Sequence, residues 1–287
     1  MKYILIADGG ATKADWILID SEGHNVCAFT TDGANPVTSG TTALAGLARQ
    51  AAVQLPKNIK ADEVHYYGAG CATPEICSKV TEELKAVFPQ SEVSVASDLL
   101  GAARSLLGTS RGIACILGTG SNSCRYDGEK IIGNTPSLGF ILGDEGSGAA
   151  LGKRLVADAF KGHLPQSVRE IFLDRYQLSM GDILAKVYRE PAPNKFLASL
   201  VPFISEHLWN PYVYAMVRRE FDSFLKRNVS PYPDSRSVPI SFTGSIAFHF
   251  SDILRKAATD AGYTVGIISS RPIEGLAEYH LKTNKKN

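Results

Sequence analysis

The strongest constraint on the fold is a repeated order of strands, glycine-rich turns and helices. Near the amino terminus "YILIADGGATKADWIL" reads as strand, glycine turn and strand, and "GIACILGTGSNSCRY" repeats this in the second half. "PISFTGSIA" matches "HYYGAG" as a strand that ends at glycine. "TVGIISSRPIEGLAEY" matches "SVASDLLGAA" as a strand followed by a helix with glycine in its first turn. Three matches in the same order indicate a duplicated domain.

The elements between these matches predict an α/β fold. Short β-rich runs and alanine- or leucine-rich stretches alternate along the first half: strands over 3–7, 14–19, 26–30, 63–68 and 92–97, and helices over 41–54, 74–88 and 98–107. Such alternation predicts a largely parallel sheet in each copy. The second copy carries an insertion of mostly helical sequence, roughly Gly143 to Arg227.

The loop-like segment "LGTSRG" places a domain boundary near Leu107 to Arg111. We therefore expect one domain over 1–107 and a second over 108–287, with a cleft between them. Small-molecule sites favour domain interfaces and the carboxyl ends of parallel strands. The glycine-rich or acidic turns of both copies follow strands, so we expect them to converge.

Composition limits the partners. The net charge is +1, with 44% hydrophobic and 21% charged residues among 287. Such a balance gives no long-range attraction to nucleic acid or an anionic membrane. Five cysteines without a CxxC pair argue against a disulfide framework, and no run approaches the roughly 20 apolar residues of a membrane span. We expect a cytoplasmic protein that acts on small molecules. A homodimer is possible.

The first turn, "DGGATK", has the chemistry of a phosphate site. Gly9 and Gly10 let a phosphate approach the backbone amides, while Thr12 adds a hydroxyl and Lys13 a charge. Asp8 would need a cation between itself and phosphate, which points to Mg²⁺. The alternative is a plain hairpin turn.

The second turn, "LGTGSNS", offers amides and hydroxyls from Gly118, Thr119, Gly120, Ser121 and Asn122, without an acidic residue. Taken alone it is equally well explained by a hairpin. Paired with the first turn, it predicts a two-sided phosphate clamp. It is not a Walker A loop, because no G-x-x-x-x-G-K-[ST] occurs.

Two carboxylates stand out beyond these turns. Asp98 falls at a strand–helix junction, where it is either a helix N-cap or a base that accepts a proton from a substrate hydroxyl. Asp144 lies with Glu145 in the glycine-rich stretch "SLGFILGDEGSGAALG". Acidic residues before a helix stabilise it mildly, but the run of glycines suggests a loop that binds a polyhydroxylated ligand. In "FTGSIA", Gly244 and Ser245 suit an adenine and ribose pocket or a close strand-to-helix turn.

Together these segments resemble the BadF/BadG/BcrA/BcrD-type ATPase family, most closely its N-acetylglucosamine kinases. These belong to the actin, hexokinase and heat-shock-chaperone superfamily of two RNase H-like domains. "ADGGATKADWILID" resembles its first phosphate loop, "ILGTGSNS" its second and "FTGSIA" its adenosine motif. "GANP", "ASDLLGA" and "GFILGDEGS" resemble its sugar-site and catalytic segments.

The resemblance implies a role for each matching residue. Asp98 matches the catalytic base and Asp8 a metal-associated position. The sugar side is matched by Asn35, Pro36, Ser121, Asn122, Gly139 and Asp144, and the ATP side by Gly9, Gly10, Thr12, Lys13, Gly118, Thr119, Gly120, Gly244 and Ser245. The chain departs from animal members at Leu138-Gly139-Phe140, where they carry a tryptophan.

These assignments predict an ATP- and Mg²⁺-dependent kinase for N-acetylglucosamine, glucosamine or a related amino sugar. Two alternatives remain. An ATPase activator of the same broad family would hold an iron–sulfur cluster through cysteines, and Cys71 and Cys77 are the only local pair. A non-catalytic sugar or nucleotide sensor would bind without turnover.

Overall fold

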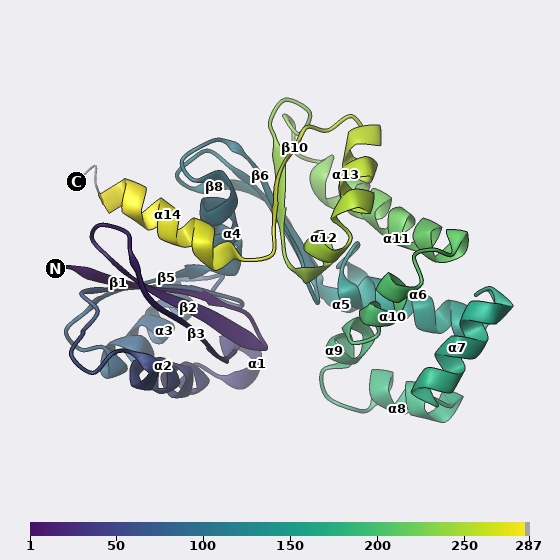
Figure 1. Cartoon of the computed structure of the whole chain (residues 1–287), viewed down its shortest axis with the longest axis horizontal. Coiled ribbons are helices and arrows are strands. Elements are labelled where there is room, and N and C mark those ends of the chain that lie inside the picture. Colours follow the sequence, from purple (N-terminus) through teal and green to yellow (C-terminus); the bar gives the residue numbers. More distant parts are fainter. Residues whose placement is uncertain (285–287) are drawn as a thin grey trace. The chain divides into compact units, whose positions relative to one another are not determined.

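Each half of the chain builds a five-stranded sheet with the same internal strand order. The computed structural model describes residues 1–284. The first sheet has the order β3-β2-β1-β4-β5 and the second β8-β7-β6-β9-β10, so the third, second, first, fourth and fifth strands of each half lie side by side. This identical order confirms the duplicated α/β fold that the sequence predicts (Figure 1).

The elements of the first half lie close to their predicted ranges. They are β1 (Tyr3–Gly9), β2 (Lys13–Asp20), β3 (Asn25–Asp32), α1 (Pro36–Ser39), α2 (Thr42–Gln54), β4 (Glu63–Gly68), α3 (Pro74–Val87), β5 (Glu92–Ser97) and α4 (Asp98–Leu107).

The second half contains β6 (Gly112–Leu117), β7 (Ser121–Tyr126), β8 (Ile131–Thr135), β9 (Ile240–Thr243), α12 (Ser245–His249), α13 (Ser251–Asp260), β10 (Val265–Ser269) and α14 (Pro272–Asn284). The helical character of the insertion is confirmed. The short helix α5 (Gly139–Leu142) precedes it, and it holds α6 (Gly148–Phe160), α7 (Gln166–Tyr176), α8 (Met180–Tyr188), α9 (Pro193–Ala198), α10 (Val201–Glu206), α11 (Pro211–Phe224) and the start of the π-helix η1 (Leu225–Val229).

The first sheet is mixed rather than largely parallel. Strands β1, β4 and β5 run parallel, whereas β1 with β2 and β2 with β3 are antiparallel hairpins. The turns that join these hairpins are too short for the crossover that a parallel pair requires. The parallel strands therefore form one side of the sheet and the hairpins the other.

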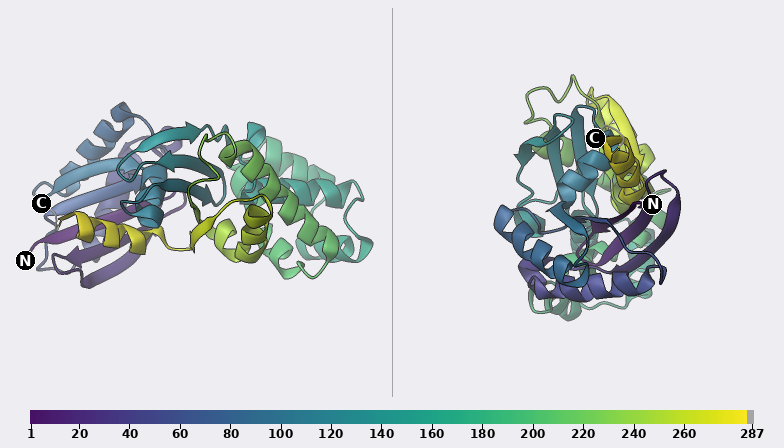
Figure 2. Two further views of the ribbon diagram at one scale, coloured as in Figure 1. Left: turned by 90° about the horizontal axis from the view of Figure 1, so that it is seen from above. Right: turned by 90° about the vertical axis from the view of Figure 1, so that its left-hand side faces the viewer.

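The two faces of the first sheet carry separate apolar clusters, because side chains alternate along a strand. Leu5 and Ala7 of β1 pack toward α2 and α3, whereas Ile4 and Ile6 pack toward α14. The helices thus cover both faces of this sheet (Figure 2). In the second half, the insertion helices share one core with β6 and β9.

Contacts divide the chain into two units that differ from the expected ranges of 1–107 and 108–287. Of the described residues, 1–111, 126–131 and 271–284 form the first unit, and 112–125 with 132–270 form the second. The carboxyl-terminal helix α14 packs along α4, β1 and β2 (Figure 1). Its contact with α4 is close, since a Cβ on Gly275 would overlap the carbonyl of Ser105.

A polar cluster fixes α14 to the sheet. The Tyr67 hydroxyl accepts a hydrogen bond from Arg104 Nη1 and lies 2.9 Å from His280 Nε2. Because arginine only donates, the Tyr67 proton goes to His280, which accepts as a neutral imidazole. The His280 ring stacks on His65 at 3.9 Å between centroids, and His65 Nε2 lies 2.9 Å from Glu63. Burial, then the charges of His65 and Arg104, lower the pKa of His280 to about 3.

Within residues 1–284, no helix combines the length and apolarity needed to cross a membrane. All five cysteines are free thiols.

His280 should make the first unit sensitive to acid. Its pKa is near 6.5 in the unfolded chain and about 3 when folded, so below pH 6.5 the unfolded chain binds the extra proton. The free energy of unfolding therefore falls as the pH decreases from about 6.5 toward 3, by at most about 1.4 kcal/mol per pH unit. In His280→Gln the amide oxygen still accepts from Tyr67 but does not titrate, so this part of the slope should vanish. Urea unfolding of both proteins between about pH 7 and 5 measures it. Equal slopes would contradict the assignment.

Candidate active site

The first glycine turn joins β1 to β2 and exposes its tip. The Gly10 amide donates to the Lys13 carbonyl, and the Gly33 amide donates to the Thr12 carbonyl, each at 2.9 Å. Thr12 is exposed. A Cβ on Gly33 would overlap the backbone of this turn, so a third glycine lets the following segment pack against it. The turn is therefore a hairpin, with Thr12 exposed, Gly10 half-buried and Gly9 buried. That Gly9, Gly10 and Thr12 contact a phosphate stays a prediction.

Lys13 is engaged at the start of β2. Its ammonium lies 2.9 Å from Asp15, an exposed ion pair, and the Thr30 hydroxyl donates to the same carboxylate at 2.8 Å. A contact between Lys13 and nucleotide, which stays a prediction, would have to compete with this pair.

Asp8 is the second-last residue of β1. It pairs with Asp15 of β2 on one side and with Tyr67 of β4 on the other. Burial, followed by the charges of Asp98 and Asp15, raises the pKa of Asp8 to about 7. Carboxylates that repel one another in this way suit a divalent cation, which would relieve the repulsion. Asp8 therefore fits the Mg²⁺ assignment by its chemistry, although no cluster of three or more His, Cys, Asp or Glu residues within 1–284 has metal-site geometry.

The structure separates the two interpretations of Asp98. The N-cap of α4 is Ser97, whose hydroxyl accepts from the Leu100 amide at 3.2 Å. Asp98 is the first helical residue, and its Oδ1 accepts from the Leu99 amide at 2.9 Å. Burial raises its pKa, with the Leu99 amide acting in the opposite sense. Asp98 is therefore not the N-cap of α4.

Strand register brings these residues to one end of the first sheet. Gly9 of β1 is opposite Gly68 of β4, which in turn is opposite Ser97 of β5. The first glycine turn, the segment 68–70 ("GAG") and the start of α4 therefore follow their strands at the same end of the sheet. The carboxyl ends of parallel strands are the usual position for ligands in α/β proteins.

Asn35 and Pro36 begin the short helix α1. Asn35 is its N-cap, and Oδ1 accepts from the Val37 amide at 3.0 Å while Pro36 occupies the first position, as prolines do. Gly70 has a φ of +82°, and a Cβ at this position would overlap Asn35 Oδ1. The side-chain amide nitrogen of Asn35 has no protein partner among residues 1–284, which leaves two N–H donors for a ligand hydroxyl.

In the second unit, Asp144 is bound to the second glycine turn. Asp144 Oδ1 accepts from the Ser121 amide at 3.1 Å, and the carboxylate fills the space that a Cβ on Gly120 would need. Gly118 and Thr119 accept from the first amides of α6, Gly148 and Ala149, at 2.8 and 3.0 Å. The predicted sugar loop and the predicted phosphate turn are thus one hydrogen-bonded assembly.

Asp144 is buried in a left-handed backbone conformation, with φ +58°. Burial raises its pKa, the Ser121 amide lowers it and the Glu145 charge raises it. Glu145 points elsewhere, because it accepts from Asn228 at 3.1 Å. Gly139, at φ +73°, is the first residue of the exposed helix α5. No atom lies within 4 Å of the position that its Cβ would take, so packing assigns it no role.

Asn122 is held rather than free. Its Oδ1 accepts from the Ser123 amide at 2.9 Å and from Asn134 Nδ2 at 3.0 Å. Asn134 was not a predicted site residue, and its place in β8 gave no signal in the sequence.

Gly244 ends β9 at φ +106°, and a Cβ there would overlap the carbonyl of Leu117. Ser245 starts α12. Register places Thr243 opposite Ile116 of β6 and Ser269 of β10, so Gly244 and the second glycine turn leave the second sheet at the same end.

Tyr66 is a further residue that the sequence did not single out. It is 1% exposed, and its hydroxyl has no hydrogen-bond partner among residues 1–284. The ring fills the space that a Cβ would need on Gly9 and on Gly68. Tyr66 therefore explains why both strand ends are glycine, and the glycines themselves were the only sequence signal.

A scan against protein-family models and a search of curated proteins both found no match. Solved structures do match. A candidate N-acetylglucosamine kinase from Porphyromonas gingivalis is 41% identical, with 99% of this chain and 100% of that one covered and a TM-score of 0.90.

More distant structures share the fold. A candidate N-acetylglucosamine kinase from Chromobacterium violaceum is 20% identical over 97% of this chain and 99% of that one, with a TM-score of 0.76. A ROK family glucokinase from Streptomyces griseus, solved with glucose and AMPPNP, is 13% identical over 100% and 99%, with a TM-score of 0.57.

The level of identity over the full length of the Porphyromonas gingivalis protein, together with the duplicated fold and the matching turns, shows that the chain belongs to the N-acetylglucosamine kinase-like family of sugar kinases in the actin-like ATPase superfamily.

Proposed function

We propose that this ATP-dependent carbohydrate kinase phosphorylates N-acetylglucosamine, glucosamine or a closely related amino sugar. The observation that carries the proposal is Asp98, a half-buried carboxylate with a raised pKa that does not cap α4, because Ser97 does. It stands at the strand ends that also carry the Gly9–Gly10 turn. The name of the relative from Porphyromonas gingivalis supports the choice of sugar.

In the proposed reaction, Asp98 accepts the proton of a sugar hydroxyl. Oδ1 is fixed by the Leu99 amide, which leaves Oδ2 for that proton. The hydroxyl oxygen forms a bond to the γ-phosphorus as the bond between that phosphorus and the bridging oxygen of ADP breaks. The amides of the two glycine turns stabilise charge on the transferred group, because phosphoryl transfer depends mainly on position and electrostatics.

The remaining residues bind and orient. Asp144, with one oxygen on the Ser121 amide, offers the other to a sugar hydroxyl, and Asn35 offers its amide N–H groups. The Gly244–Ser245 turn lets a nucleotide lie against its backbone. Asp8 would hold Mg²⁺, which when bound neutralises phosphate charge.

The ATPase-activator alternative has no support from the cysteines. Burial, then the charges of Cys77 and Asp98, raises the pKa of Cys71 to about 12, and the Cys77 thiol donates to the Cys71 carbonyl at 3.4 Å. Cluster ligands are thiolates, which this environment disfavours.

Release of ADP, measured by a coupled assay over a panel of hexoses and amino sugars, tests the proposed function. We expect turnover with at least one N-acetylated or free amino sugar, at a kcat/KM at least about tenfold above that for glucose, since a site that pairs with a polar substrate group rejects analogues lacking it. Equal or better use of glucose would refute the amino-sugar assignment. Sugar binding without ADP release would indicate a sensor.

Asp98→Asn should lower kcat on the best sugar by roughly 10²–10⁴-fold, because the amide does not accept the hydroxyl proton. ATP affinity and thermal stability should stay near wild type. The matched control is Ser97→Ala, which removes the observed cap and should cost about 1 kcal/mol of stability while it keeps the base. If Asp98→Asn keeps more than about a tenth of kcat, Asp98 is not the base.

Asp144→Asn should weaken sugar binding by about tenfold or more, because a sugar hydroxyl loses a charged acceptor. Asparagine tolerates the left-handed backbone and still accepts from Ser121, so the glycine turn and ATP binding should be preserved. Calorimetry with sugar and with an ATP analogue measures both affinities. A normal sugar affinity would remove Asp144 from the site, and an equal loss for the ATP analogue would assign it to the turn instead.

A further inference from the structure

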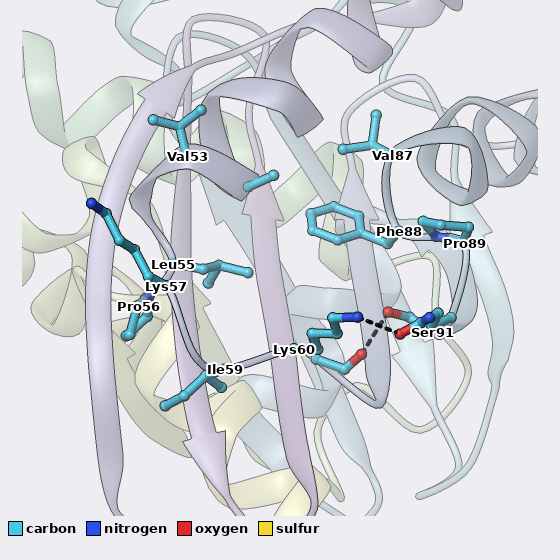
Figure 3. Close-up of a pocket in the computed structure, with 13 residues that line it drawn as sticks. Val53, Leu55, Pro56, Lys57, Ile59, Lys60, Val87, Phe88, Pro89 and Ser91 are labelled. Carbon is cyan, nitrogen blue, oxygen red and sulfur yellow. Dashed lines mark hydrogen bonds between the residues drawn. The ribbon is translucent and has the colours of Figure 1, made fainter.

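A separate hollow lies at the far end of the first sheet from Asp98. It has a volume of about 450 Å³, within the usual size range of small-molecule sites. One wall comes from the end of α2 and the segment before β4, and the other from the end of α3 and the segment before β5 (Figure 3). Since β4 spans six residues, its two ends are about 20 Å apart.

The floor and walls of the hollow are mainly apolar. Phe88 and Ala61 are buried at its base, and Leu55, Ile59 and Val87 are half-buried around it. These side chains would pack against a ligand of aliphatic or aromatic character, and their apolar surface is already gathered in one place.

The two walls are tied together without a ligand. The Ser91 hydroxyl donates to the Ala61 carbonyl at 2.6 Å, and Lys60 Nζ donates to Gln90 Oε1 at 3.0 Å (Figure 3). Both bonds cross from one wall to the other. The hollow is therefore preformed, which lowers the entropic cost of filling it.

The charge of the hollow is positive. Lys57 and Lys60 line it and no carboxylate does. The neighbouring Asp62 accepts from the Tyr3 amide at 2.7 Å instead. Among residues 1–284, Lys60 bonds only to a neutral amide oxygen and Lys57 has no partner. This differs from lysines that form ion pairs, such as Lys79 with Glu75 at 2.7 Å.

From this combination we propose that the hollow binds an organic monocarboxylate with an apolar aliphatic or aromatic body. The Lys60 ammonium is bonded to the amide oxygen of Gln90, and both the ammonium and the Gln90 amide group keep N–H donors for the oxygens of a carboxylate. The apolar body packs on Phe88, Ile59 and Val87, while the exposed Lys57 adds positive potential at the rim. The site is independent of the proposed kinase reaction.

The probe pair 4-phenylbutanoate and 4-phenylbutan-1-ol tests the proposal, since the two differ in the charged group. Binding is measured by calorimetry and by amide chemical shifts, without ATP or sugar, so that failure of the kinase assignment does not affect the result. The acid should bind more tightly than the alcohol, by up to about fivefold, the advantage expected from one exposed charge pair. Shifts should centre on residues 52–61 and 87–91.

Three variants sharpen the test. Lys60→Gln should weaken binding of the acid by about fivefold and leave the affinity for the alcohol unchanged. Ala52→Phe, which fills the hollow but keeps both lysines, should weaken the binding of both probes. Lys85→Gln, an exposed lysine that does not line the hollow, is the matched control and should change neither.

Three results would overturn the proposal. They are equal affinity for acid and alcohol, unchanged acid binding in Lys60→Gln, and absence of saturable binding by the acid up to about 10 mM, where a site of millimolar affinity would be mostly filled.

Discussion

The proposed chemistry depends on one constraint, which is that β1, β4 and β5 end in register. Parallel register sets Gly9, Gly68 and Ser97 opposite one another. The Tyr66 ring fills the space that side chains on Gly9 and Gly68 would need, so only glycine fits at these two strand ends. The same register places the proposed phosphate-binding turn and the start of α4 at one end of the sheet.

Electrostatic repulsion is concentrated around Asp8 and Asp98, the carboxylates of the proposed site. Asp8 and Asp98 both have raised pKa values, with burial as the first cause, and the charge of Asp98 adds to the shift of Asp8. Such an arrangement costs folding free energy in the absence of ligand. It suits a site that receives a cation and a proton, which explains why carboxylates rather than neutral side chains stand there.

The duplicated units have diverged in what they supply. The first unit provides two half-buried carboxylates, Asp8 and Asp98, whereas the second provides a glycine turn bound to a buried carboxylate, Asp144, from the insertion. Asp144 is pinned by the amide of Ser121, and α6 donates its first amides to the same turn. In the second unit, the loop proposed to bind sugar and the turn proposed to bind phosphate are therefore linked by hydrogen bonds. The preformed hollow lined by Phe88, at the other end of β4 and β5 in the first unit, takes no part in these hydrogen bonds.

The sequence by itself determined the duplicated α/β fold, the helical insertion and the position of each glycine turn, because strand periodicity and glycine placement are local properties of the chain. It also placed Asp98 at a strand–helix junction, yet it could not decide between cap and base. Tertiary structure gave the cap to Ser97, the acceptor of the Leu100 amide. It likewise returned α14 to the first unit and put Asp144 under the second turn. These outcomes rest on packing and hydrogen bonds between residues far apart in the chain, which no local pattern records.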